Sequence, residues 1–154
     1  MCKLCWTLLV LLIAVAGVGV WRFMAGAPTT VAEDGRRVIQ VSSAERNLVL
    51  REMREFLVAV RKIVEAAEKN DMDAVATAAA AAGMKVTHAM PPGLMGKLPL
   101  EFKQLGMSVH SGFDQIALDA QSLGDPGHTR GQLVQLLYKC EGCHASFRLE
   151  AAGQ

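Results

Sequence analysis

The feature that most constrains this chain is an uncharged apolar run near its N-terminus. It extends from Leu4 to Trp21 and is bounded by Lys3 and Arg22. A helix of about 20 apolar residues crosses the hydrocarbon core of a bilayer, and this run comes close to that length. Trp6 and Trp21 lie near its two ends, where membrane helices commonly carry interfacial tryptophans. We therefore expect residues 1–25 to form a membrane anchor or a signal segment.

A cleaved signal peptide is the competing interpretation of this segment. Ala25-Gly26-Ala27 resembles the small-x-small site at which signal peptides are cut. The length of the apolar run and the Trp21-Arg22-Phe23 sequence just before that site favour an uncleaved anchor. Both interpretations predict that the chain is exported.

The rest of the chain has the size of one domain. The chain has 154 residues and a formal net charge of +1, and it has no run of Lys or Arg, so we expect no nucleic-acid partner. Aromatic residues are scarce while alanine, leucine and methionine are frequent, which favours helices. Residues 26–42 are rich in Gly, Pro, Thr and Ser and are expected to be a linker, which leaves residues 43–154 as the domain.

Four helical stretches are expected in this domain. Ser42 and Glu45 form a capping box at the start of the first, and Pro99 fits the first turn of the third. The breaks between the stretches are Asn70-Asp71, Pro91-Pro92-Gly93 and Gly124-Asp125-Pro126-Gly127. Apolar residues recur at steps of three and four, as in Leu50, Met53, Leu57, Val60 and Val64 of the first stretch. The pattern predicts an all-α domain, an antiparallel four-helix bundle.

The last stretch carries the sequence Cys140-Glu141-Gly142-Cys143-His144. Two cysteines three residues apart, followed by a histidine, form the pattern for covalent c-type haem attachment. Each thiol adds across one vinyl group of the porphyrin, so both must lie on one face of a helical turn. The neutral imidazole that follows can then bind the iron. We expect one haem c, held by Cys140 and Cys143 as thioethers, with His144 as the proximal iron ligand.

Two other interpretations of this motif are a zinc half-site and a dithiol redox pair. A zinc site needs further Cys or His ligands, and the only other cysteines are Cys2 and Cys5 in the apolar N-terminal segment. A thioredoxin-like pair would follow a strand in an α/β pattern. The helical pattern around the motif favours haem.

Taken together, these features resemble the class II c-type cytochromes, the cytochrome c-prime family and its low-spin relatives. The resemblance rests on four helical stretches, attachment near the C-terminus, and the run from Cys140 to Arg148, and it covers about residues 43–149. It implies that the last helix presents the haem to the interior of the bundle. It also implies that Arg148, four residues after the histidine, lies near the proximal side of the haem. A solvated cation favoured by the helix dipole is the other interpretation of Arg148.

The resemblance also concerns the distal side of the iron. In the low-spin members a methionine from the first helix binds the iron, whereas in the c-prime members an apolar residue leaves that side open to small gases. Met53 is the only methionine among the inward positions of the first stretch, and we expect it to be the distal ligand. Leu50, with Arg46 four residues before it as the family often shows, is the alternative distal residue.

These expectations define the function that the sequence favours. A His/Met-ligated haem leaves no open iron position for turnover, so the chain is expected to carry single electrons and not to be an enzyme. Its expected partners are redox proteins and the membrane, and a homodimer is left open. Because c-type attachment takes place outside the bacterial cytoplasmic membrane, the domain is expected on the periplasmic side. The alternative function is a five-coordinate protein that binds nitric oxide or other small gases.

Overall fold

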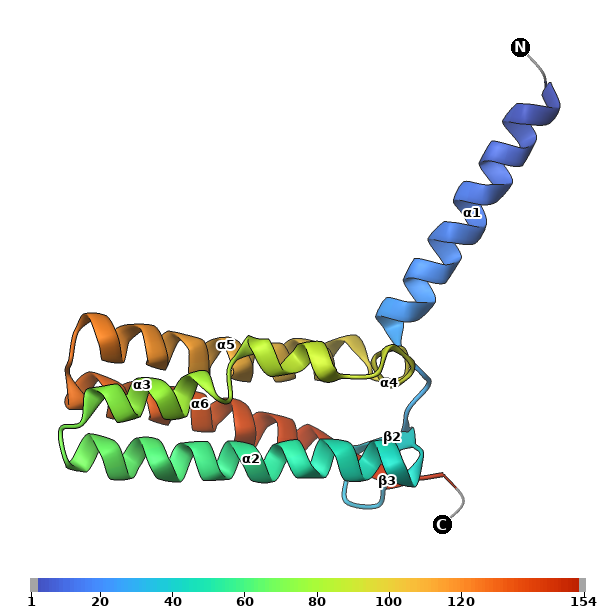
Figure 1. Ribbon diagram of the computed structural model, residues 1–154. Coiled ribbons are helices and arrows are strands. Elements are labelled where there is room, and N and C mark those ends of the chain that lie inside the picture. Colours follow the sequence, from blue (N-terminus) through green and yellow to red (C-terminus); the bar gives the residue numbers. More distant parts are fainter. Residues whose placement is uncertain (1–2, 153–154) are drawn as a thin grey trace.

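The chain is mostly helical in the computed structural model, which describes residues 3–152 and, for His88 and Ala89, the backbone only. Met1 and Cys2, at the start of the expected anchor, and Gly153 and Gln154, at the end of the expected domain, lie outside the described residues. Figure 1 shows a long N-terminal helix that projects from a compact helical part of the molecule.

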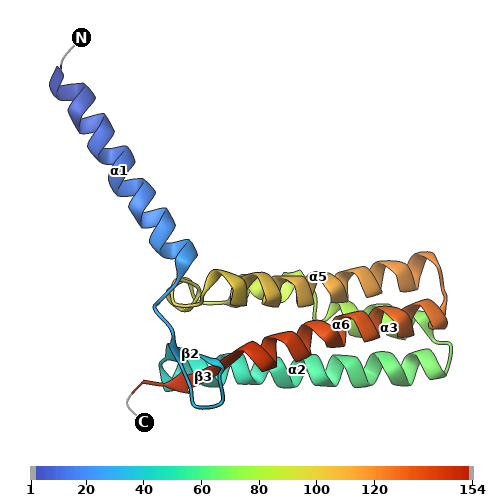
Figure 2. The ribbon, with the colours of Figure 1, turned by 180° about the vertical axis from the view of Figure 1, so that it is seen from behind.

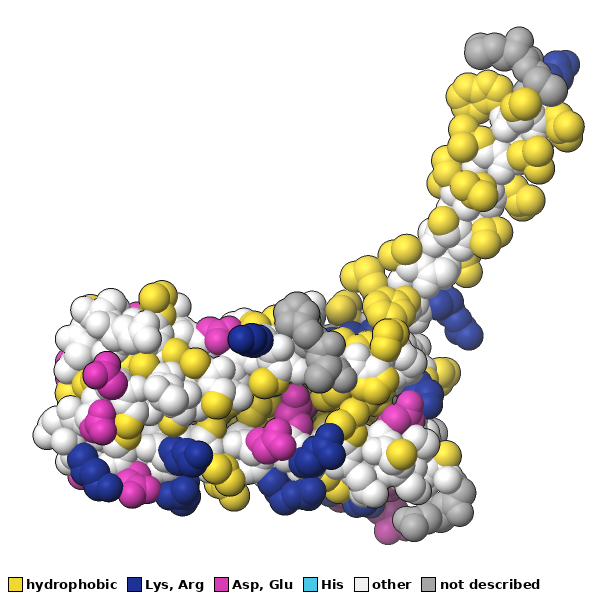
Figure 3. Space-filling view, viewed as in Figure 1, with side chains coloured by type: hydrophobic (Ala, Val, Ile, Leu, Met, Phe, Trp, Pro, Cys, Tyr) yellow, Lys and Arg dark blue, Asp and Glu magenta, His cyan; other side chains and the backbone are white. Residues whose placement is uncertain are grey.

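This projecting helix is α1, Lys3–Ala25, and it is long and apolar enough to cross a membrane. Its mean hydropathy reaches 2.4 over the most apolar window, and no residue of that window is buried. Figure 3 shows hydrophobic side chains along its visible length. The expected N-terminal apolar helix is confirmed, and it is compatible with either a membrane anchor or a signal segment.

The first two helices of the domain begin at the capping residues that the sequence predicts. The second helix, α2 (Ser43–Glu68), is preceded by Ser42, whose side chain accepts a hydrogen bond from the backbone of Glu45 while the Glu45 side chain accepts one from Ser42. The third, α3 (Met72–Ala80), is preceded by Asp71, whose side chain accepts from the backbone of Ala74. Both caps satisfy backbone donors that have no partner inside the helix.

The remaining helices follow α3 along the chain. They are the 3-10 helix η1 (Met84–Ala89), the short α4 (Pro92–Met95), α5 (Leu100–Ser122) and α6 (Pro126–Ser146). Figures 1 and 2 show α2, α3, α5 and α6 side by side and running in alternate directions. We call these four helices the helical body. Within it α3 packs against α2 and α5, and α6 packs more extensively against α5 than against α2.

A small sheet closes one end of the helical body and departs from the all-α expectation. Its strands are β1 (Thr30–Val31), β2 (Arg37–Val41) and β3 (Phe147–Ala151), in that order across the sheet. Strand β2 pairs antiparallel with β1 and parallel with β3. Residues 26–42, expected as a linker, therefore contain two strands, and the chain after Ser146 leaves the helix to become the third. Ile39 and Val41 are buried on one face of β2, and Val38 is buried on the other.

The buried side chains form two separate cores. The alanine core joins the four helices of the body, and half of its buried residues are alanine: Ala59, Ile63, Ala66, Ala67, Val75, Ala76, Ala79, Ala82, Val109, Phe113, Ile116, Ala120, Leu133 and Leu136. The sheet-end core lies where the sheet meets α2, α4 and α5, and it consists of Ile39, Val41, Val49, Leu94, Leu98, Phe102 and Phe147.

Candidate functional site

The Cys-x-x-Cys-His motif lies in the last two turns of α6. The helix begins at Pro126, where Asp125 accepts a hydrogen bond from the backbone of Gly127 at 2.7 Å. It ends because Phe147 is extended, with φ −133° and ψ 150°, although its N–H still donates to the carbonyl of Cys143. The motif is therefore held between a regular helix and the start of β3.

Cys140 and Cys143 lie three residues apart on this helix, so their side chains share one face. Both thiols are free and half-buried. Burial raises the pKa of both thiols, so the neutral thiol is favoured over the thiolate. A dithiol redox pair needs the opposite shift, because its attacking group is a thiolate. The electrostatics of the pair therefore disfavour the dithiol interpretation.

Cys143 packs against the sheet-end core. Phe102 and Phe147 of that core meet edge to face, with ring centroids 5.5 Å apart. Met53 is half-buried and packs against the same core from α2. The fold thus brings Cys143 and the predicted distal residue Met53 to one apolar cluster.

Two further positions belong to the expected iron site. His144 is exposed at the end of α6. Leu50 is half-buried, and among the described residues it belongs to neither core cluster. Of the two predicted distal candidates, only Met53 shares a cluster with Cys143.

Arg148, which the resemblance implied near the proximal side of the haem, follows His144 by four residues and lies beyond the end of α6. The helix has ended by that point, and Arg148 is part of β3. Its guanidinium lies 3.0 Å from a carboxylate oxygen of Glu150 and 3.4 Å from one of Asp34. The structure therefore gives Arg148 partners at the surface of the sheet.

Two methionines outside the long helices also pack against the sheet-end core. Met90 precedes α4 and Met95 ends it, and both are half-buried against the sheet-end core. Periodicity could not have placed them there, because neither belongs to a long helix. Together with Met53 and Cys143 they give one side of this core four flexible, polarizable sulfur side chains.

The other histidines with described side chains have partners of their own. His110 is buried, with its Nδ1 2.8 Å from the carbonyl oxygen of Ala82, and its Nε2 lies 3.5 Å from Glu52. The Nε2 of His128 lies 3.0 Å from Asp119. Among residues 3–152, no group of three or more His, Cys, Asp and Glu side chains is arranged to hold a metal ion.

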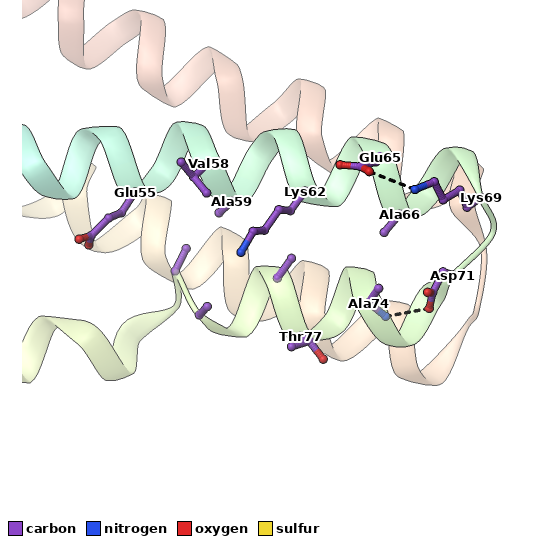
Figure 4. A pocket seen from close by; sticks show the side chains of 13 residues that line it. Glu55, Val58, Ala59, Lys62, Glu65, Ala66, Lys69, Asp71, Ala74 and Thr77 are labelled. Atoms are coloured by element: carbon purple, nitrogen blue, oxygen red, sulfur yellow. Dashed lines mark hydrogen bonds and ion pairs between the residues drawn. The ribbon is translucent and has the colours of Figure 1, made fainter.

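A groove of about 740 Å³ lies between α2 and α3, away from the motif. Figure 4 shows its small alanine side chains, such as Ala59 and Ala66, and the charged side chains of Lys62, Glu65 and Lys69 beside them. Glu65 and Lys69 pair with each other at 3.0 Å. No residue of the Cys-x-x-Cys-His motif lines this groove.

Comparisons of the chain with protein-family models, with curated proteins and with solved structures find no match.

Proposed function

We propose that this chain is a membrane-anchored c-type cytochrome that carries single electrons. In this proposal the helical body is an antiparallel four-helix bundle with one haem covalently attached to α6. The observation that carries it is the pair of free, half-buried thiols three residues apart on α6, followed by an exposed imidazole. The haem would supply an iron that alternates between two oxidation states without a change in the protein's covalent structure.

The residues at the site fit such a group. Cys140 and Cys143 are free thiols on one helical face, as two thioether bonds to the same porphyrin require. The apolar core against which Cys143 packs, which includes Phe102, suits a flat hydrophobic ring. His144 follows directly and has the nitrogen donor that haem iron takes in c-type sites.

Met53 favours the carrier over the gas-binding alternative. It packs on the same core as Cys143, and a thioether ligand would fill the sixth position and raise the reduction potential. Leu50 lies outside this cluster among the described residues, so the geometry gives less support to an apolar residue that leaves the iron open.

The location follows from α1 and from the attachment chemistry. An uncleaved α1 would hold the domain at the membrane, and attachment outside the cytoplasmic membrane would place it on the periplasmic side. Redox proteins of that compartment would be its electron donors and acceptors. Cleavage of α1 would leave a soluble periplasmic carrier with the same site.

The decisive experiment is covalent attachment in a bacterial host that has a c-type maturation system. We expect the denatured chain to carry the added mass of one haem and to stain for haem on a denaturing gel. Cys140→Ser and Cys143→Ser should each weaken or abolish that signal. Cys5→Ser is the matched control, because Cys5 is exposed on α1 and should not affect attachment. An unmodified mass for the wild-type chain in this host would refute the proposal.

A second measurement separates the two functions. The reduced carrier should resist carbon monoxide, because Met53 would occupy the sixth position. Rapid binding of carbon monoxide by the wild-type protein, with high-spin spectra in both oxidation states, would replace the carrier by the gas-binding protein.

A further inference from the structure

The C-terminal end of α1 is attached to the domain by contacts with α5. Lys103, in the first turn of α5, is buried and donates hydrogen bonds from its Nζ to the carbonyls of Phe23 at 2.6 Å and Met24 at 3.3 Å. Its Nζ also lies 5.0 Å from the centre of the Phe23 ring. The last carbonyls of a helix lack partners within it and carry the negative end of its dipole, so a buried ammonium stabilises this end of α1.

The residues that follow α1 pack closely against the residues just before α5. Gly26 has a φ of +79°, and a Cβ at this position would lie 2.3 Å from the carbonyl oxygen of Leu98. The next residue, Ala27, donates its N–H to the carbonyl of Lys97 at 3.0 Å. This junction therefore fixes the direction of α1 relative to the start of α5. In Figures 1 and 2, α1 rises on the side of the body on which α5 lies, and α2 lies on the opposite side.

The outer face of α5 carries an apolar stripe. Leu100, Met107 and Leu118 are 38%, 49% and 58% exposed. They follow one another at intervals of seven and eleven residues, about two and three helical turns, so they lie along one line. Gln104, Ser111 and Asp114 are exposed between them, and of these three only Asp114 is charged.

Each acidic side chain of α5 has a partner on a neighbouring element, although Glu101 and Asp114 are exposed. Glu101 pairs with Arg37 of β2, Asp114 accepts a hydrogen bond from the backbone of Met84 at 3.0 Å, and Asp119 accepts from side chains of α6. Helix α2 is different, because it has many exposed Arg, Lys and Glu side chains: Arg51, Arg54, Glu55, Arg61, Lys62, Glu65 and Lys69. Figure 3 shows these charges along the side of the body away from α1.

We propose that the α5 stripe of Leu100, Met107 and Leu118 rests on the surface of the bilayer that α1 spans. The stripe is apolar, the carboxylate that lies on the same line, Asp114, is held by the backbone of Met84, and the junction holds that face on the side from which α1 leaves. A helix of this kind lies in the membrane interface with its apolar side chains among the headgroups and upper acyl chains. The body then lies along the membrane with α5 against the lipid and α2 facing the aqueous compartment. This inference rests on the retention of α1 as an anchor, and it does not depend on the haem.

The test uses the full chain in nanodiscs of phosphatidylcholine and phosphatidylglycerol. The photoreactive residue benzoylphenylalanine is introduced at Met107, at Leu118, or at Leu57 of α2, so that all native cysteines stay in place. Leu57 is the matched control, because it is a leucine that is 70% exposed on the opposite side of the body. After irradiation, intact-mass measurement counts chains that carry one phospholipid, and far-UV circular dichroism verifies that each variant is folded.

We expect phospholipid adducts at positions 107 and 118 in at least several-fold greater yield than at position 57. Equal yields at positions 118 and 57 would overturn the proposal. A chain that has lost residues 1–25, or that does not migrate with the nanodiscs, would overturn it too, because the anchor would be absent. Neither result would affect the proposed function, whose test is the covalent mass of the haem.

Discussion

The two cores of this protein are packed with different kinds of side chain. In the alanine core, small side chains such as Ala66 and Ala79 let the helices approach closely, and Phe113 and Ile116 fill what remains. In the sheet-end core the buried centre is bordered by large, half-buried side chains, among them Met53, Met95 and Cys143.

This difference indicates where a large ligand can enter. Close-packed interiors resist a change of volume, because each side chain already touches neighbours on all sides. A border of methionines adapts more easily, because the unbranched thioether chain has several rotatable bonds. Cys143 lies at the adaptable core, and the alanine core acts as the rigid part that holds the helices in register.

The largest effect that we expect comes from truncation in the alanine core. Phe113 is 1% exposed and stacks on Phe56 with ring centroids 5.5 Å apart. Phe113→Ala should lower the free energy of unfolding by about 3–5 kcal/mol, because a rigid core cannot collapse into the cavity. Met95→Ala, at the border of the sheet-end core, should cost only about 1–2 kcal/mol, because Met95 is half-buried and its neighbours can rearrange.

Urea unfolding of the full chain in a mild detergent, followed by circular dichroism at 222 nm, measures both values. Equal losses for the two variants would contradict the distinction between a rigid core and an adaptable one.

The second prediction concerns the ion pair between Glu45, in the first turn of α2, and Lys97, just before α5. The Nζ of Lys97 donates hydrogen bonds to both carboxylate oxygens of Glu45, each at 2.8 Å. Together with the hydrogen bond from the backbone N–H of Ser42, they lower the pKa of Glu45 from 4.5 to about 2. A carboxyl with a lowered folded-state pKa stabilises the fold above its unfolded pKa. That contribution is lost as the pH falls from about 4.5 toward 2.

Glu45→Gln should therefore lower stability by about 1–2 kcal/mol at pH 7, a value reduced for the exposure of Lys97, and should flatten the acid limb of the stability curve. Glu65→Gln is the matched control at the other end of α2, because Glu65 pairs with Lys69 and Arg61 on an exposed surface. Its pH profile should stay close to that of the wild-type protein. The same flattening in both variants would show that the Glu45 pair has no special role. Urea midpoints measured from pH 7 down to pH 3 provide the comparison.

The sequence predicted the features of this fold that depend on nearby residues. The Ser42–Glu45 capping box and the Asp71 cap each join residues three positions apart, so the pattern alone specifies them. The sheet could not be predicted in this way. Its central strand β2 is short, and its partner β3 lies at the other end of the chain. Phe147 fits an apolar helical seam as well as a strand, and pairing with β2 decided between them.

The same limit applies to the candidate site. The spacing of Cys140 and Cys143 and the seam position of Met53 are local patterns, and the structure places Met53 and Cys143 at one core. Met90 and Met95 reach that core only through the turn around α4, which has no periodicity to reveal it. The role expected for Arg148 came from the resemblance, and the sequence pattern did not reveal that α6 ends at Ser146 and that Arg148 belongs to β3.

The smallest effects on stability should come from exchanging the methionines of the sheet-end core. Met53→Leu, Met90→Leu and Met95→Leu nearly conserve volume, and each should change the free energy of unfolding by less than about 1 kcal/mol. The visible spectrum should separate them, because leucine has no sulfur to donate. If Met53 is the sixth ligand, Met53→Leu alone should raise the spin state and lower the reduction potential, since a thioether favours reduced iron. A spectral change confined to Met90→Leu or Met95→Leu would instead assign the ligand to the turn around α4. Three unchanged spectra would mean that all three methionines only adapt the core to its neighbours.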